Sequence, residues 1–411
     1  MTASLAPSTR TTARAFGGLW VARDVAALGD GILLVALLCW SYQLQESATA
    51  ASILVVAMLL PPFLLRPLAP KLVSRGSARV VGAAGQLLRA AALTPLLGVG
   101  VGVNQQLVLS VAFVAAIPSA LVQAAHETSL RALVKTEHLP AAQKALSRTR
   151  LLALAAGPAA GTALYGASGL DGATLAVLAA LAVSAVGLAV ARPPVATDSS
   201  GDQAIGPADL QRGLLLALRH PSLRTVAVVQ MWTALSTGGL AVVMVAFTVW
   251  GVYATSENVG LLLAAMGLGA VAASLVWDRF GHLFLPSHSI ATAIGIAATS
   301  GFALSLTSSM NEAAPFCVAT GFGLRLLGAG VDALLAAHST PEQRPALLAG
   351  LDMATSTACI LSAVAMGPLC DLMTPRLTLV LACILLSVLG LYAFASVANP
   401  DERALPNRYN G

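Results

Sequence analysis

The sequence predicts an all-α membrane protein with twelve transmembrane helices in two six-helix bundles. Three observations lead to this prediction: long apolar stretches, a low content of charged residues, and positive charge concentrated between alternate stretches. A helix crosses a hydrocarbon core of about 30 Å with about 20 residues. The apolar stretches approach or exceed this length, and they cover residues 16–43, 50–68, 80–101, 106–126, 148–166, 173–191, 225–250, 258–277, 287–308, 313–336, 346–370 and 377–398.

The positive charge predicts the orientation of the chain. If the N-terminus lies inside, 19 of the 23 Lys and Arg residues fall in inside segments, and only Arg376 falls in an outside loop. The other three, Arg23, Arg89 and Arg325, lie within apolar stretches. Because Lys and Arg accumulate in cytoplasmic loops, we expect both termini in the cytoplasm. The net charge of +5 then reflects loops facing an anionic lipid leaflet, and no nucleic-acid partner is expected.

The composition argues against an enzyme. The chain is 57% hydrophobic and 10% charged, whereas a soluble domain has about 25% charged residues. It has no phosphate-binding GxxxxGKS or GxxxxGKT loop, no HExxH and no GxSxG, and its five cysteines lack metal-site spacing. We therefore expect no enzyme activity, cofactor or metal. The first apolar stretch carries Asp24 and Asp30 and lacks a small-residue cleavage site, which favours an uncleaved span over a signal peptide.

The longest inside segment divides the chain. Residues 192–224 begin as a Pro-, Ser- and Asp-bearing linker and continue as DLQRGLLLALRHPSLR, which predicts an amphipathic helix on the membrane surface. The expected domains are an N-terminal bundle over 1–191, this linker, and a C-terminal bundle with a short tail over 225–411. Two six-span halves with a substrate site between them near the midplane form a transporter architecture.

Ionisable residues within spans are candidates for proton coupling. Each costs about 2.5–3.5 kcal/mol at the membrane centre on insertion scales, and such residues usually face a cavity or a partner. Asp30 and Arg89 lie near mid-span, as does Arg325, while Asp332 and Asp352 lie toward the cytoplasmic half. Burial raises the proton affinity of a carboxylate, and a nearby arginine lowers it. A carboxylate whose arginine partner leaves in one conformation and returns in another would therefore bind and release a proton. Asp30 is the first choice for this role, with Arg89 as counter-ion and Asp332 and Asp352 as further candidates. A fixed Asp–Arg pair that only pins helices together is the alternative.

Arg325 and Asp332, seven residues apart on one helical face, form either a static pair or a gate.

Aromatic and amide side chains are candidates for substrate binding. A drug-sized pocket is mostly apolar with a few polar groups, and Trp40, Gln123, Gln230 and Trp232 have these chemistries. Tryptophan is also common in the interfacial belt, so Trp40 and Trp232 have packing as an alternative role. His126, at the cytoplasmic end of the fourth span, is interpreted as a solvated interfacial residue.

Several segments, in order along nearly the whole chain, carry a family resemblance. The first span contains LWVARDVAALGDGILLVAL, the third QLLRAA, and the fifth GPAAG over 157–161. The eighth span ends in WDRFG, and STPEQRPALLAGLDMATS leads into the eleventh. Together these segments resemble the major facilitator superfamily, and within it the twelve-span drug/proton antiporters that include macrolide-efflux-like exporters.

The resemblance implies a secondary transporter that exports small amphiphilic molecules, such as drugs or natural products, in exchange for protons, as multidrug-resistance pumps do. It implies a multi-pass protein of the bacterial inner membrane, and we expect a monomer. The matching motifs imply gating roles at Gly157, Pro158 and Gly161 in the fifth span, and at Arg75, Asp278 and Arg279. Ser74 stands where the family's loop motif has Asp, so that latch is expected to be weakened or moved to the Asp278–Arg279 copy.

Two other functions remain open from the sequence. One is the dedicated export of an endogenous metabolite, lipid or siderophore. The other is a membrane sensor that keeps the transporter scaffold without transport, an idea that the altered loop motif at Ser74 permits.

Overall fold

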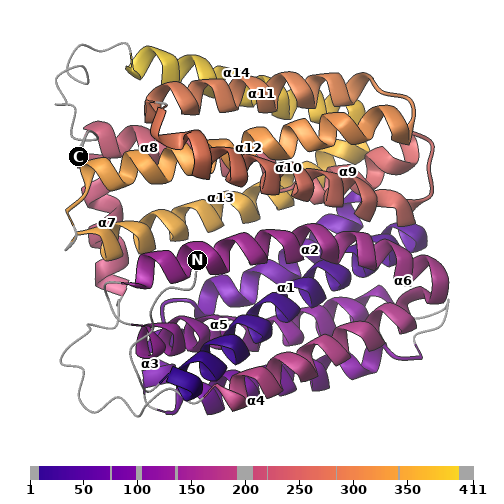
Figure 1. Ribbon diagram of the computed structural model, residues 1–411. Helices are drawn as coiled ribbons and strands as arrows, with labels where there is room; N and C mark the ends of the chain where they lie inside the picture. The colour runs from indigo at the N-terminus through magenta and orange to yellow at the C-terminus, as the bar shows by residue number, and fades with distance from the viewer. Residues whose placement is uncertain are drawn as a thin grey trace. The chain divides into compact units, whose positions relative to one another are not determined.

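The regular structure of the chain is helical throughout the described ranges, as predicted (Figure 1). The computed structural model describes residues 9–74, 76–98, 104–134, 138–191, 207–219, 221–283, 285–340 and 343–397. The α-helices are α1 (Thr9–Gln45), α2 (Ala48–Leu65), α3 (Ala69–Ser74), α4 (Ala78–Leu93), α5 (Gln105–Leu133), α6 (Leu139–Val190), α7 (Pro207–Arg219), α8 (Pro221–Thr237), α9 (Leu240–Trp250), α10 (Val259–Phe280), α11 (Pro286–Leu306), α12 (Met310–His338), α13 (Arg344–Leu372) and α14 (Pro375–Val397).

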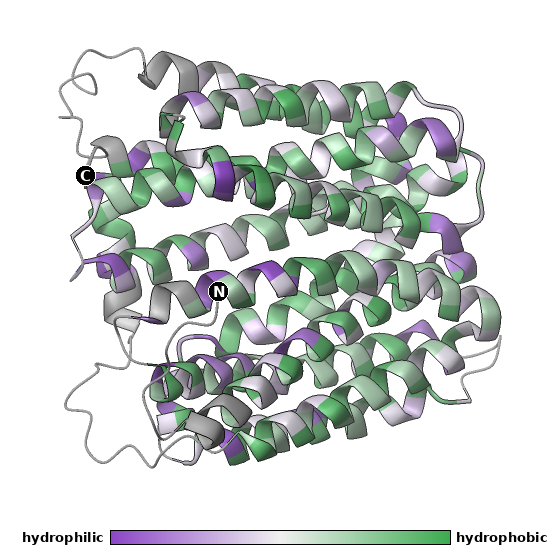
Figure 2. Ribbon diagram, viewed as in Figure 1, coloured by the Kyte–Doolittle hydropathy of each residue, from purple (hydrophilic) through white to green (hydrophobic). Residues whose placement is uncertain are grey.

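The helices account for twelve membrane crossings. Within the described ranges, nine helical segments are long and apolar enough to span a membrane, and α8 with α9 forms one of them. The helix α6 has 52 residues, or about 78 Å at 1.5 Å per residue, which is far too long for one crossing. It is interrupted at Gly169, whose φ of 64° and ψ of −157° suit glycine alone, so it supplies two spans. The helices α4 and α14 complete the set, and apolar residues dominate along the helices (Figure 2).

The chain divides into two compact units. Unit 1 comprises residues 1–37 and 57–206. In it, α4 packs against α5 and α6. A buried cluster that includes Leu19, Val122, Leu146 and Leu188 joins α1, α5 and both parts of α6. The helices α1 and α6 also approach closely at Gly18 and Gly187, where a Cβ on Gly187 would lie 2.7 Å from Gly18 O. Small residues thus fix α1 against α6 by direct backbone contact.

Unit 2 comprises residues 38–56 and 207–411. The helix α12 packs against α10 and α11, and α11 packs against α14, side by side in Figure 1. The predicted amphipathic helix is present as α7, which packs against α13 and α8. Its apolar face buries Ala217 completely in the core of this unit. This face therefore serves protein packing.

The seventh span is broken at Gly238 and Gly239, between α8 and α9. A Cβ on Gly238 would lie 2.6 Å from the Cα of Cys359 in α13, so only glycine permits this approach. The N–H of Gly239, freed at the break, donates to Ser362 Oγ at 2.9 Å. The close contact with α13 explains why a continuous apolar stretch forms two helices.

The turn between α1 and α2 is held within unit 2 by Asp371 near the end of α13. Its carboxylate accepts hydrogen bonds from Ser47 Oγ at 2.7 Å, from Ala48 N at 2.8 Å and from Thr49 N at 2.9 Å. An N-cap normally comes from the residue preceding the helix. Here Ser47 Oγ accepts a long bond from Ala50 N at 3.4 Å, and Asp371, distant in sequence, accepts the two shorter ones. Next to this cap, Ser52 Oγ donates to Ala363 O at 2.6 Å.

Candidate functional site

The strongest candidate site is an ion pair inside unit 1. Arg89 Nη2 of α4 lies 2.5 Å from Asp30 Oδ1 of α1. The two side chains differ in accessibility: 9% of the Arg89 side chain is exposed, against 48% of the Asp30 side chain. The arginine is therefore enclosed by protein, while the carboxylate keeps an open side from which a proton or another group can reach it.

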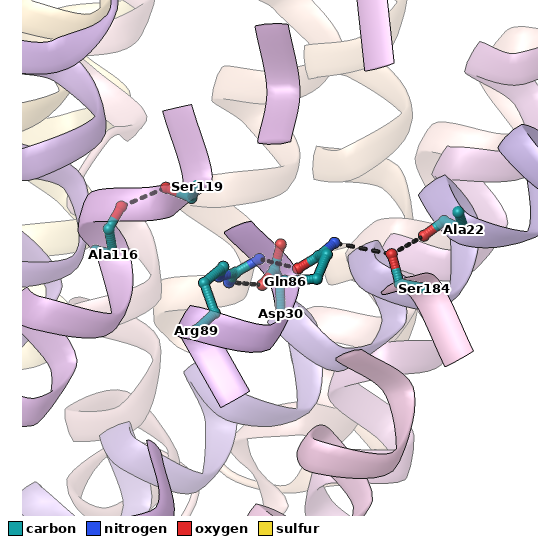
Figure 3. Close-up of polar contacts among 7 residues, drawn as sticks. All are labelled: Ala22, Asp30, Gln86, Arg89, Ala116, Ser119 and Ser184. Atoms are coloured by element: carbon teal, nitrogen blue, oxygen red, sulfur yellow. Dashed lines mark hydrogen bonds and ion pairs between the residues drawn. The ribbon is translucent and has the colours of Figure 1, made fainter. Parts of the chain in front are cut away.

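A chain of hydrogen-bonded polar groups also contacts Arg89 (Figure 3). Arg89 Nη1 donates to Gln86 Oε1 at 3.5 Å, and Gln86 Nε2 donates to Ser184 Oγ at 2.8 Å. The Ser184 hydroxyl donates in turn to the carbonyl of Ala22 at 2.7 Å. Gln86 and Ser184 are fully buried. Because each member is held by the next, the arginine is fixed in place from α4, α6 and α1 together.

The Arg89 guanidinium remains incompletely bonded. Its Nε is buried and has no hydrogen-bond partner among the described residues. Removing the charge of Asp30 would leave a largely buried cation with weak compensation, which is energetically unfavourable. The arrangement therefore favours an ionised carboxylate next to Arg89 in this conformation.

The residue after Asp30 lies in a close contact between α1 and the first part of α6. A Cβ on Gly157 would lie 2.8 Å from Leu28 O and 3.0 Å from Gly31 Cα. A Cβ on Gly31 would meet Pro158 Cδ at 2.9 Å. One turn further, a Cβ on Gly161 would lie 3.0 Å from Val35 Cβ. The Gly157, Pro158 and Gly161 motif thus faces α1 at the position of Asp30.

The other residues predicted for proton coupling and gating lie elsewhere. Asp332 and Asp352 are exposed on α12 and α13. Arg325 Nε donates to Ser274 Oγ of α10 at 3.0 Å, and no ion pair with Asp332 occurs within the described ranges. The structure thus gives Arg325 a hydroxyl partner in place of the carboxylate expected from the sequence spacing.

Of the two loop motifs expected to act as latches, only the Asp278–Arg279 copy lies entirely among the described residues. Asp278 and Arg279 lie in the last turn of α10. Arg75 lies outside the described residues, and Ser74 ends α3. The Ser74 hydroxyl donates to Lys71 O at 3.0 Å within its own helix.

The four substrate-binding candidates have different surroundings. Gln123 is exposed on α5 in unit 1. Trp40, in unit 2, is 9% exposed. Trp232 Nε1 donates to Leu385 O of α14 at 2.7 Å, and its ring packs on the core of unit 2. Gln230, two residues earlier on α8, has a buried Oε1 without a hydrogen-bond partner among the described residues. Gln230 is therefore the candidate with unused bonding capacity.

Sequence reasoning missed Gln86, Ser184 and Gly31. Gln86 had a usable signal, since it precedes Arg89 by three residues and residues at this spacing share a helix face. Ser184 had none, because a lone serine in an apolar span is common. His126 was interpreted as solvated, but it is 8% exposed and its Nε2 has no partner among the described residues. This interpretation is wrong, because neighbouring helices cover the ring.

Twelve apolar crossings, with an ion pair between two of the helices, are typical of a multi-pass membrane transporter. The family model described as Major Facilitator Superfamily matches residues 19–310, more than half of the sequence. The chain belongs to the Major Facilitator Superfamily. A search of curated protein sequences returned no match.

Solved structures with the same fold are transporters. A mutant of the nucleoside transporter NupG superposes with a TM-score of 0.73 at 12% identity, over 93% of this chain and 99% of that one. A bacterial homologue of the human lysosomal transporter Spinster gives 0.69 at 15% identity, over 94% and 97%. The human organic anion transporter MFSD10 gives 0.69 at 14% identity, over 93% and 99%. At these identities the likeness establishes the fold.

Proposed function

We propose that the protein exports small amphiphilic molecules, drugs or natural products, in exchange for protons, and that Asp30 carries the proton. The observation that carries this proposal is the uneven ion pair, in which an accessible carboxylate faces an arginine fixed by a buried network. The pattern of Lys and Arg supports a location in a bacterial cytoplasmic membrane with both termini inside. Arginine outnumbers lysine 20 to 3, a bias typical of high-GC bacterial genomes. The protein works as a monomer in this proposal.

The coupling follows from the electrostatics of the pair. When Asp30 is ionised, it neutralises Arg89 and the pair is stable. When Asp30 binds a proton, Arg89 loses its counter-charge and the contact between α1 and α4 weakens. Protonation therefore favours a conformation in which the two side chains separate. Because one charge moving across 100 mV gains about 2.3 kcal/mol, a single proton supplies enough energy to shift such an equilibrium strongly.

The remaining roles in the proposal are assigned from motifs. Gly157, Pro158 and Gly161 allow α6 to move against α1, and Arg75, Asp278, Arg279 and Arg325 bias the closed state on the cytoplasmic side. Asp332 and Asp352 are reserve proton sites. Trp40, Gln123, Gln230 and Trp232 contact the substrate, and Gln230 supplies the unsatisfied acceptor that a substrate donor would bond.

Everted membrane vesicles test the proposal. Vesicles with wild type, Asp30→Asn or Glu46→Gln at matched expression are energised and given a panel of amphiphilic antibiotics and dyes. Substrate uptake and internal pH are then followed. Glu46 is the control because it is an exposed carboxylate in the turn between α1 and α2. Uptake that discharges the pH gradient in wild type and in Glu46→Gln, but not in Asp30→Asn, is the expected result.

Other results redirect or reject the proposal. Uptake that persists in Asp30→Asn with a discharging gradient keeps the exporter but moves the proton site, and Asp332→Asn and Asp352→Asn are then measured. Uptake without any change of the pH gradient rejects proton exchange. Absence of flux for every compound rejects drug export and leaves a dedicated metabolite exporter or a sensor.

A further inference from the structure

Two helices are divided between the compact units. In α1, residues up to 37 belong to unit 1 and the remainder to unit 2, while in α2 the residues up to 56 belong to unit 2. Segment 38–56 thus holds the ends of both helices and the turn between them, which the charge pattern predicts to lie outside the membrane. Transporters of this architecture move one helical bundle against the other. The two helices cannot follow both units in such a movement, so one of their attachments has to open.

The attachment of α1 to unit 1 consists of backbone contact and apolar packing. A Cβ on Gly18 would lie 2.9 Å from Gly187 O, so the two backbones touch. Next to this contact, Leu19 is buried in the cluster shared by α1, α5 and α6. Packing of this density is lost as soon as the helices separate. This attachment is therefore unfavourable to open.

The attachment of the turn to unit 2 depends on the carboxylate of Asp371. It accepts hydrogen bonds from Ser47 Oγ, Ala48 N and Thr49 N, at 2.7, 2.8 and 2.9 Å. Both N–H groups belong to the first turn of α2, where no partner exists within the helix and the helix dipole favours an anion. Asp371 is itself exposed. Water can therefore replace these bonds when the turn leaves.

Beyond the turn, segment 38–56 covers groups that would be uncovered if it left unit 2. Ser52 Oγ donates to Ala363 O at 2.6 Å. On α1, the Cys39 thiol donates to Ser256 O at 3.2 Å, and the Cys39 side chain is fully buried. The reactivity of Cys39 therefore reports whether the segment lies on unit 2.

We propose that Asp371 is the latch for segment 38–56, and that opening toward the outside breaks its three hydrogen bonds and carries the segment away from α13. Asp371 is a positioning residue in this role, because it sets how often the segment leaves and need not touch the substrate. The role holds for any substrate. It depends on the movement of helical bundles in this family and not on drug export or proton exchange.

The experiment measures the reaction of Cys39 with N-ethylmaleimide in the purified full-length chain in nanodiscs, followed by peptide mass spectrometry. Asp371→Asn keeps the shape of the side chain but leaves only one accepting oxygen. The matched control is Asp171→Asn. Asp171 is also an exposed carboxylate that accepts a backbone hydrogen bond, from Gly98 N at 2.9 Å, but it lies in unit 1. No substrate or pH gradient is needed, so the result is independent of the proposed function.

Two other cysteines distinguish release of the segment from general loss of stability. Cys317 on α12 and Cys383 on α14 are buried in unit 2. In Asp371→Asn we expect Cys39 to react about tenfold faster or more, because hydrogen bonds to a charged group are lost. Cys317 and Cys383 should keep their wild-type rates, and Asp171→Asn should leave all three rates unchanged.

Two results overturn the proposal: an unchanged rate at Cys39 in Asp371→Asn, or a similar increase at all three cysteines. A milder variant keeps the test decisive if Asp371→Asn does not fold. Ser47→Ala removes one of the three bonds to Asp371, so Cys39 should react about threefold faster. A wild-type rate in Ser47→Ala also overturns the proposal.

Discussion

Replacing Gly157 by alanine tests whether the contact between α1 and α6 is as tight as the structure indicates. The new Cβ would lie 2.8 Å from Leu28 O and 3.0 Å from Gly31 Cα. Both atoms belong to the backbone, so relief requires the helices to separate. Overpacking of this kind costs about 1–3 kcal/mol. Alanine also gains about 0.8–1 kcal/mol over glycine in a helix interior, so the net loss is smaller than the overpacking cost alone.

A matched variant removes the propensity term from this comparison. Gly17 in α1 has no atom within 4 Å of the position of a new Cβ, so Gly17→Ala gains the helix preference without a clash. The difference in unfolding free energy between Gly17→Ala and Gly157→Ala should therefore equal the overpacking term, about 1–3 kcal/mol. The measurement is SDS-induced unfolding of the purified protein in mixed micelles, followed by near-UV circular dichroism. Equal stability of the two variants would refute the reasoning, because it would mean that the helices separate without loss.

Three further predictions concern single interactions. In a double-mutant cycle with Asp30→Asn and Arg89→Gln, we expect a coupling energy of about 1–2 kcal/mol. This value lies between those of exposed and buried ion pairs, because one side chain of the pair is exposed and the other is buried. A coupling energy near zero would contradict the expectation. Asp371→Ala should destabilise the start of α2 by about 1–2 kcal/mol, visible as faster hydrogen exchange there and not in the rest of unit 2. Trp232→Phe keeps the aromatic ring but loses the bond to Leu385 O, so unfolding stability should fall by about 1 kcal/mol. Stability equal to wild type would show that this bond contributes nothing.

Most of the fold was predictable because a sequence that spans a membrane must meet two simple requirements. Each crossing needs a long apolar helix, and the loops must carry the charge. The break in the seventh span had one local signal, the Gly238–Gly239 pair, but glycine within an apolar span is also tolerated in a continuous helix, so the pair alone did not predict a break. The break depends on the approach of the Cys359 backbone to Gly238, which is a tertiary contact. The role of Asp371 as a cap for α2 was hidden for the same reason.

The candidate site was predictable only in its charged part. An ionised residue inside a span must find a partner, so Asp30 and Arg89 could be singled out from the sequence. Gln86 and Ser184 are neutral, and their roles depend on how three helices are rotated about their axes. Arg325 shows the limit of helical spacing, which predicts that residues share a face but not which neighbouring helix that face meets. The hydroxyl of Ser274 on another helix is its partner.

The proximity of the ion pair to the glycine contact suggests how proton binding and helix movement are linked in the proposed exporter. Asp30 immediately precedes Gly31, where α1 packs closely against the backbone of the first part of α6. A shift of α1 against the first part of α6 at this contact displaces the Asp30 side chain, whereas Arg89 is bonded through Gln86 to Ser184 in the second part of α6. Because an ion pair weakens steeply once its hydrogen bond is lost, such a displacement weakens the contact between Asp30 and Arg89. Bulk at Gly157 should therefore alter the pH dependence of transport as well as stability, and Gly17→Ala should leave that pH dependence unchanged.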